Sequence, residues 1–377
     1  MSERLVGRQL LAAALLSLVL RVWLSGLFEL SPDEALYVTW AWGRPGVDHP
    51  PLLVWALRAA LRAPLSLERA TRLVPALCAL GTWWCLDGLL VAWKAHARAR
   101  WALLLAGLLP LPATGALIAT PDGPMVLFTA LALRGALQVG EARAWGWVLA
   151  PAAALAVLSK AQALWLLPAL AVCAPREARG ALLLALASQM AVLPQALPSL
   201  RFQLVHAFTA QGPAEGLAAP TRFPLEGVLA FLGGQVALLL PGLPWVRLRE
   251  ASTREGALAL AVLVSVAPVL VSGLVRIPEP SWSAPAMPMV MLLLALGSAR
   301  VDRRRWAAGG ALVVVAAAVL HLQAARPVLP LPARADPTSR LRGWRAVVCD
   351  GATHPWRPLP PYALAAERAV YGGRCGR

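Results

Sequence analysis

Long runs of apolar residues recur along the chain, and they constrain its fold more than any other feature. The first is LLAAALLSLVLRVWLSGLF, and further Leu-, Ala- and Val-rich runs of comparable length follow it. A helix of roughly 17–25 residues crosses the ~30 Å hydrocarbon core of a bilayer. The runs are continuously apolar rather than alternating, which favours helices over a β-barrel. With 59% hydrophobic and 14% charged residues, the chain is predicted to be a polytopic all-α membrane protein.

We expect about eleven transmembrane helices of this kind. They cover residues 10–28, 70–92, 101–118, 123–139, 145–158, 161–174, 181–198, 225–245, 256–275, 284–299 and 306–323. The fifth and sixth are short and are expected to form a broken or re-entrant pair. Residues 1–323 are therefore assigned to a membrane domain, whose first outer loop is 29–69. Residues 324–377 form an extramembrane tail, for which we expect a strand and a helix.

Loops rich in arginine and lysine alternate with loops that carry few of them. The basic residues are Lys94, Arg98, Arg100, Arg143, Arg176, Arg179, Arg247, Arg249, Arg254, Arg300, Arg303, Arg304 and Arg305. The positive-inside rule places these loops and the N-terminus in the cytoplasm, so the tail of an inner (plasma) membrane protein is extracytoplasmic. Nucleic-acid binding is not expected despite the net charge of +16, because the basic residues form no compact domain.

The same orientation gathers most of the remaining polar residues at the opposite, extracytoplasmic face. They are Asp33, Glu34, Asp48, His49, Asp122, Lys160, Arg201, His206 and Arg276. These side chains come from loops that are far apart in the sequence. Their convergence on one face predicts a functional site there.

Two of the acidic motifs have a second explanation in helix capping. Ser31 is a good N-cap, and Glu34, three residues later, completes a capping box with it. Thr120-Pro-Asp-Gly is a second helix start of the same kind. For either motif alone, capping explains the residues equally well. Asp48 and His49, in Asp-His-Pro-Pro, do not fit a helix start. Acids grouped in one loop system tune one another's pKa and serve as bases or metal ligands, which favours a site.

The basic residues of this face are candidate ligands for an anion. Lys160 follows an apolar span, where a charge is costly and therefore functional or paired, with snorkelling to the interface as the alternative. Arg276 has a similar alternative as a boundary anchor, and Arg201 as part of a solvated loop. Arg58 and Arg62 share one face of LLVWALRAALR, which reads as an interfacial helix.

A series of segments resembles, in order, the family 39 glycosyltransferases. The segments are PDEALYVTWAWGRPGVDHPPLLVW, ATPDGPMVLFTALAL, VLSKAQALWLLPAL, RFQLVHAF, GGQVALLLPGLPW, PSWSAPAMP and DPTSRLRGWRAV. This family comprises bacterial relatives of the dolichyl-phosphate-mannose protein mannosyltransferases and of the aminoarabinose lipid A transferases. The resemblance implies a GT-C type bundle. It also implies transfer of one sugar (EC 2.4), with inversion, from a polyprenyl-phosphate donor to a hydroxyl of a lipid, glycan or protein, as in cell-envelope glycosylation.

Carried over by the resemblance, Asp33 matches the first-loop acid proposed as catalytic base, and Glu34 is its neighbour in the motif. Asp48 and His49 match the acid and the next residue before the Pro-Pro corner, and Asp122 matches the TPD acid. In the aminoarabinose lipid A transferase branch the position of His49 is a lysine. Histidine there argues against that branch or for a different donor.

The charges fit this chemistry, because sugar transfer needs a base and a positive charge near the departing phosphate. Lys160, Arg276, Arg201 and Arg58 are the candidate ligands of the lipid phosphate. Candidate ligands of a divalent metal ion (Mg²⁺, Mn²⁺ or Zn²⁺) are Asp33, Asp48, His49 and Asp122. A transporter or flippase of lipid-linked sugars and a catalytically silent lipid-binding scaffold stay open as alternatives, as does a Cys349–Cys375 disulfide in an oxidising periplasm.

Overall fold

The computed structural model describes residues 3–43, 46, 48–208, 221, 223, 225–246, 251–333, 336–355, 359 and 362–375. These residues form helices and no extended strand. The helices are α1 (Glu3–Leu24), α2 (Pro32–Trp42), α3 (Leu52–Ala60), α4 (Leu67–Ala92), α5 (Ala97–Ala106), α6 (Pro110–Gly115), α7 (Asp122–Gln138), α8 (Ala144–Ser159), α9 (Leu166–Cys173), α10 (Arg179–Phe208), α11 (Glu226–Leu239), α12 (Thr253–Ser272), α13 (Met287–Ser298), α14 (Arg303–Ala325), α15 (Trp344–Cys349) and α16 (Ala363–Tyr371).

Seven helical stretches are long and apolar enough to cross a membrane. They are Glu3–Leu27, Leu67–Ala92, Arg176–Val205, Glu226–Trp245, Thr253–Ser272, Pro280–Ser298 and Arg303–Ala325. The fold class predicted from the sequence is therefore confirmed. The other expected spans are also helical but shorter, and lie in α5 with α6, in α7, in α8 and in α9 with its preceding 3₁₀ turn. The expected number of spans stays a prediction.

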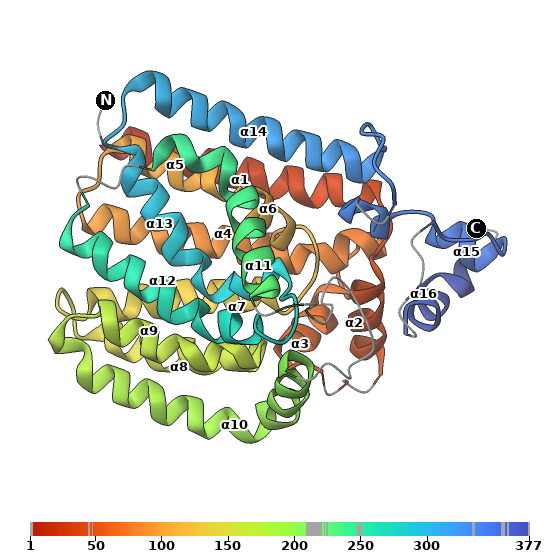
Figure 1. Ribbon diagram of the computed structural model, residues 1–377, viewed down its shortest axis with the longest axis horizontal. Coiled ribbons are helices and arrows are strands. Elements are labelled where there is room, and N and C mark those ends of the chain that lie inside the picture. The colour runs from red at the N-terminus through yellow and green to blue at the C-terminus, as the bar shows by residue number, and fades with distance from the viewer. Residues whose placement is uncertain are drawn as a thin grey trace.

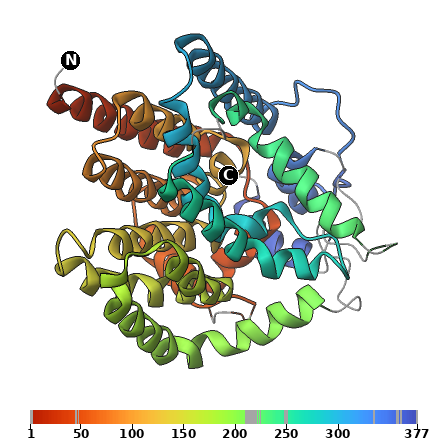
Figure 2. The ribbon, with the colours of Figure 1, turned by 60° about the vertical axis from the view of Figure 1, so that its left-hand side comes forward.

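The long helices lie side by side, with α10 and α14 on opposite edges of the bundle (Figures 1 and 2). The bundle is held by a continuous apolar core to which most of its helices contribute, with Leu86, Leu103, Leu133, Leu149 and Leu292 among its fully buried members. Apolar side chains on the outer helices are exposed instead, as Val19 on α1 and Leu183 on α10 are. Exposed apolar faces of this kind suit a bundle surrounded by lipid.

The expected span 101–118 is interrupted between α5 and α6. Pro110 opens α6 and has no backbone N–H to continue the ladder of α5. Backbone carbonyls left open at membrane depth need another donor. The buried Arg21 of α1 supplies it, donating to the carbonyl oxygens of Gly107 at 3.0 Å and Ala113 at 3.5 Å. A cation inside an apolar helix is thus explained by the break in its neighbour.

Helices α2, α3, α15 and α16 lie together at one end of the bundle, at the right of Figure 1, whereas the N-terminus lies at the other end. The start of α2 is fixed by the predicted capping box. Ser31 Oγ accepts from the Glu34 N–H at 3.3 Å, and Glu34 Oε2 accepts from the Ser31 N–H at 2.9 Å. Capping is therefore part of the role of this motif. It fixes where α2 begins at this end of the bundle.

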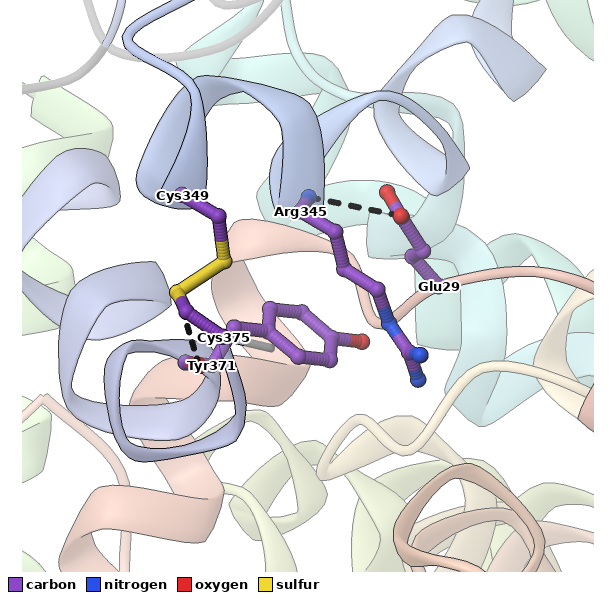
Figure 3. Close-up of a disulfide and its surroundings, with 5 residues drawn as sticks. All are labelled: Glu29, Arg345, Cys349, Tyr371 and Cys375. Carbon is purple, nitrogen blue, oxygen red and sulfur yellow. Dashed lines mark hydrogen bonds between the residues drawn. A yellow bond between two sulfur atoms is a disulfide. The ribbon is translucent and has the colours of Figure 1, made fainter. Parts of the chain in front are cut away.

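The tail forms the helices α15 and α16, so the expected strand was wrong for the residues described. A disulfide joins Cys349 to Cys375, with their Cα atoms 5.5 Å apart (Figure 3). The sequence alone had left this bond open. Apolar side chains of α15 and α16, among them Trp344 and Val370, are buried against Leu30 and Val38 in the first loop and α2. The tail is therefore packed onto the segment that carries the PDE motif.

Replacing Cys349 and Cys375 by serine should loosen the tail locally. The disulfide spans 26 residues, and closing a loop of that length stabilises by about 3 kcal/mol in the chain-entropy description. We expect amide hydrogens of α16 to exchange faster, measured by hydrogen–deuterium exchange in detergent, while those of α4 keep their protection. Cys173→Ser, which removes an unbridged cysteine, is the control. Unchanged exchange in α16 would show that apolar packing alone holds the tail.

Candidate active site

Tyr37 of α2 is the buried residue around which the predicted acids gather. Burial raises its pKa well above the usual value, and the charges of Asp33, Tyr362, Asp122 and Asp48 raise that pKa further. Charges act on a pKa in this way when they lie close to the group. The structure therefore brings acids from three separate motifs, together with one residue of the tail, to a single side chain.

Glu279 belongs to the same group, although the sequence analysis did not single it out. It is half-buried in the loop before α13, and burial raises its pKa. The charges of Asp33 and Asp122 raise that pKa further, whereas Lys160 and Arg340 lower it. The only sequence signal for Glu279 is its place as an acid between two apolar spans. Arg340 has no sequence signal that distinguishes it from the other arginines of the tail.

Asp122 and Lys160 form an ion pair in which Lys160 Nζ donates to Asp122 Oδ1 at 2.8 Å. The side chains are 14% and 6% exposed respectively. Asp122 is the first residue of α7, and Lys160 directly follows α8, so the antiparallel packing of these two helices brings the residues together. Lys160 is thus buried and paired rather than snorkelling to the interface.

Asp33 and Glu34 are adjacent in sequence but lie in different environments, because successive residues of a helix point about 100° apart. Asp33 is half-buried and accepts a hydrogen bond from the Tyr362 hydroxyl. Glu34 is fully buried and accepts from Arg72 Nε at 2.9 Å and Arg72 Nη2 at 2.7 Å. Its Oε1 also accepts from the Ala119 N–H at 3.0 Å. With its Ser31 bond, both oxygens of Glu34 are occupied.

These contacts give a structural role to Glu34, which the sequence had grouped with Asp33, Asp48, His49 and Asp122 as a candidate catalytic residue. Arg72 also donates to the carbonyl oxygens of Ser25, Phe28 and Glu29, at 2.7, 2.9 and 2.6 Å. Glu34 and Arg72 therefore join the first loop, α4 and the residues just before the TPD motif. We infer that Glu34 fixes the position of Asp33, which faces the acids around Tyr37.

The Asp-His-Pro-Pro loop is held between α2 and α10. The main-chain oxygen of Asp48 accepts from Ser199 Oγ at 2.9 Å and Gln203 Nε2 at 3.1 Å. Burial raises the pKa of the Asp48 carboxyl group. The His49 ring lies against Tyr37, with 5.9 Å between the ring centroids. Both residues are therefore placed at the site by contacts that the sequence does not reveal.

The expected phosphate-binding arginines divide into two groups. Arg58 donates to the carbonyl oxygens of Ala41 at 3.0 Å and Gly43 at 2.7 Å, and so caps the C-terminal end of α2. Arg201 is exposed on α10, and the side chain of His206 on the same helix lies outside the described residues. These contacts show Arg58 in a structural role rather than directed at an anion.

Arg276 lies closer to the acids. It is 4% exposed; burial lowers its pKa, and the charge of Glu279 opposes that shift. Arg276 is thereby linked through Glu279 to the group that includes Lys160 and Arg340. Lys160, Arg340 and Arg276 are thus cations whose charges act on this group of acids or are acted on by it.

The proposed metal ligands do not form a coordination set as they are placed. In the part of the chain that the structure describes, no group of three or more His, Cys, Asp or Glu side chains is arranged to hold a metal ion. Asp122 is paired with Lys160, and Asp33 with Tyr362. We therefore derive no step through a metal.

Comparison with known proteins agrees with this architecture. The family model described as dolichyl-phosphate-mannose-protein mannosyltransferase matches residues 48–194. Two crystal structures of ArnT from Cupriavidus metallidurans share the fold. Each match covers 99% of this chain and 76% of the ArnT chain. The apo structure has a TM-score of 0.60 at 20% identity, and the structure bound to undecaprenyl phosphate 0.61 at 19%. No curated protein matches the sequence.

These findings confirm the resemblance that the sequence predicted and show a GT-C type fold. The family match begins at Asp48 and includes Asp122 and Lys160, whereas Asp33 and Glu34 lie before it.

Proposed function

We propose that the protein is a membrane glycosyltransferase that moves a single sugar from a polyprenyl-phosphate-linked donor to an acceptor hydroxyl at the extracytoplasmic face. The observation that carries this proposal is the grouping of Asp33, Asp48, Asp122 and Glu279 with Lys160 and Arg340 at one end of an apolar bundle. Acids and cations held together beside lipid suit a reaction between a hydroxyl and a lipid-linked phosphate ester. The acceptor is a lipid, a glycan or a protein.

In the proposed reaction Asp33 takes the proton of the acceptor hydroxyl. The hydroxyl oxygen forms a bond to the anomeric carbon, and the bond from that carbon to the phosphate oxygen breaks. The electron pair of that bond leaves with the polyprenyl phosphate. Lys160, Arg276 and Arg340 stabilise the departing phosphate, as preorganised positive charge does where negative charge develops. Attack opposite the leaving group inverts the anomeric configuration.

The topology proposed with this function is that of an inner-membrane protein with a cytoplasmic N-terminus and an extracytoplasmic site and tail. The Cys349–Cys375 disulfide supports that side for the tail, because disulfides persist in oxidising compartments. Among the described residues, the basic loops that follow α4, α7 and α13 lie at the other ends of these helices, which suits the positive-inside rule for cytoplasmic loops.

The proposed function is tested with purified protein, a radiolabelled polyprenyl-phosphate sugar and membrane acceptors in vesicles. We expect the label to move from the donor to an acceptor, with release of polyprenyl phosphate. Labelled donor that crosses the bilayer without being consumed would instead identify a flippase. Bound but unreacted donor would identify a lipid-binding scaffold. Repeating the assay with a chelator tests whether transfer depends on a divalent metal ion.

Replacing Lys160 by methionine should weaken the binding of undecaprenyl phosphate. A hydrogen bond to a charged group contributes about 1.5–3 kcal/mol, which corresponds to roughly 10–100-fold in affinity. Binding to detergent-solubilised protein is measured by microscale thermophoresis. The double variant Lys160→Met, Asp122→Asn distinguishes the effect of losing the cation from the effect of leaving Asp122 unpaired. The control is Lys94→Met, because Lys94 lies just after the C-terminal end of α4, at the opposite end of the bundle. Equal affinities for wild type and Lys160→Met would exclude this lysine as a phosphate ligand.

A further inference from the structure

The C-terminal tail is anchored to the first loop at several points. The Glu29 carboxylate accepts from the backbone N–H of Trp344 at 2.6 Å, at the start of α15. It also accepts from the backbone N–H of Arg345 at 3.3 Å (Figure 3). The Tyr371 hydroxyl accepts from the Leu30 N–H at 2.8 Å. Residues more than 300 positions apart in sequence are thus joined directly before the PDE motif.

A second set of contacts fixes α15 and α16 against α4. Arg345 Nη2 donates to Glu68 Oε1 at 2.8 Å, and the Tyr371 hydroxyl donates to the same oxygen at 3.3 Å. Glu367 of α16 is fully buried, and burial raises its pKa to about 9. Its protonated form is therefore favoured at pH 7. The tail is held against α4 by these polar contacts as well as by its apolar side chains.

Tyr362 directly precedes α16 and extends from this anchored tail to the site. Its hydroxyl donates to Asp33 Oδ1. A hydrogen bond to one carboxylate oxygen limits the rotation of the whole group, so that Oδ2 keeps a defined direction. Both residues also lie close enough to Tyr37 for their charges to act on it.

We propose that Tyr362 is a positioning residue that the C-terminal tail supplies to the reaction, acting through Asp33. This inference rests on the proposed function. By holding Oδ1, Tyr362 leaves Oδ2 as the oxygen that takes the acceptor's proton. Positioning of a base to within about half an ångström is what such supporting hydrogen bonds provide. The tail is therefore part of the active site, and its anchoring contacts serve catalysis.

The kinetic test is a double-mutant cycle with Tyr362→Phe and Asp33→Asn. Tyr362→Phe keeps the ring and should lower kcat roughly 10-fold, with the donor KM unchanged. In the Asp33→Asn background the same change should have no further effect, because residues that act as a unit are not additive. An equal loss in both backgrounds would overturn the proposal. Asp302→Asn, at a residue that caps α14 and has no part in the site, should leave kcat within roughly 2-fold of wild type.

A second readout does not depend on turnover. The chain has three tyrosines, so an ultraviolet resonance Raman difference between wild type and Tyr362→Phe isolates the signal of Tyr362. We expect the signature of a hydroxyl donating to a carboxylate, and a changed signature in Asp33→Asn. An identical signal in both proteins would show that the contact is absent. Wild-type protein that transfers no sugar would instead contradict the proposed function, which keeps the two failures distinct.

Discussion

Asp33→Asn is expected to reduce sugar transfer by about 10²–10⁴-fold, the contribution of a positioned general base. The amide of asparagine has nearly the same shape as the carboxylate and can still accept from Tyr362, but it cannot take the proton of the acceptor hydroxyl. Binding of undecaprenyl phosphate should stay within roughly 3-fold of wild type, because the cations are untouched. Initial rates with a radiolabelled donor, together with direct binding measurements, test both parts.

Asp302→Asn is the matched control for this substitution. Asp302 caps α14 at the opposite end of the bundle by accepting from the Arg305 N–H, and asparagine caps helices as well as aspartate does. Its transfer rate should equal that of wild type. Transfer that survives in Asp33→Asn at the wild-type rate would rule out Asp33 as the base.

Arg72→Met should destabilise the fold more than any surface substitution. The side chains of Arg72 and Glu34 are both 0% exposed and form a 2.7 Å ion pair. Removing one partner leaves the other charge buried without compensation, which costs about 3–5 kcal/mol. The carbonyl oxygens of Ser25, Phe28 and Glu29 also lose their donor. We expect a markedly lower midpoint in thermal unfolding in detergent, with loss of transfer because Asp33 is displaced.

Arg305→Met provides the comparison with an exposed pair. Arg305 and Asp302 are 69% and 62% exposed at 3.7 Å, and such pairs contribute about 0–1 kcal/mol. Its unfolding midpoint should match that of wild type closely. Equal midpoints for Arg72→Met and Arg305→Met would contradict the anchoring role given to the Glu34–Arg72 pair.

The sequence predicted the parts of the fold that depend on local pattern. Apolar runs of bilayer length became helices, since a backbone in lipid must satisfy its hydrogen bonds internally. Ser31 and Glu34 formed the expected capping box. The short expected span 161–174 forms a 3₁₀ turn followed by α9. The division of the chain into a membrane domain and a tail at residue 323 stays a prediction.

The sequence did not predict contacts that depend on how distant helices pack. Arg72 lies at the start of an expected span, and nothing local indicates that it pairs with Glu34. Tyr362 and Glu279 carry no motif, so only the docking of the tail and of the loop before α13 brings them to Asp33. Arg58 looked like an anion ligand, yet its partners are the carbonyls that end α2.

In the proposed reaction the charged group around Lys160 and Asp33 binds the lipid phosphate of the donor. A cryo-electron microscopy structure of the protein with undecaprenyl phosphate tests it most directly. We expect the phosphate within hydrogen-bonding distance of Lys160, with Arg276 or Arg340 beside it and Asp33 on the side of the sugar. A phosphate bound instead in the open hollow lined by Leu243, Arg305 and Leu312, with the Lys160–Asp122 pair unchanged, would contradict it.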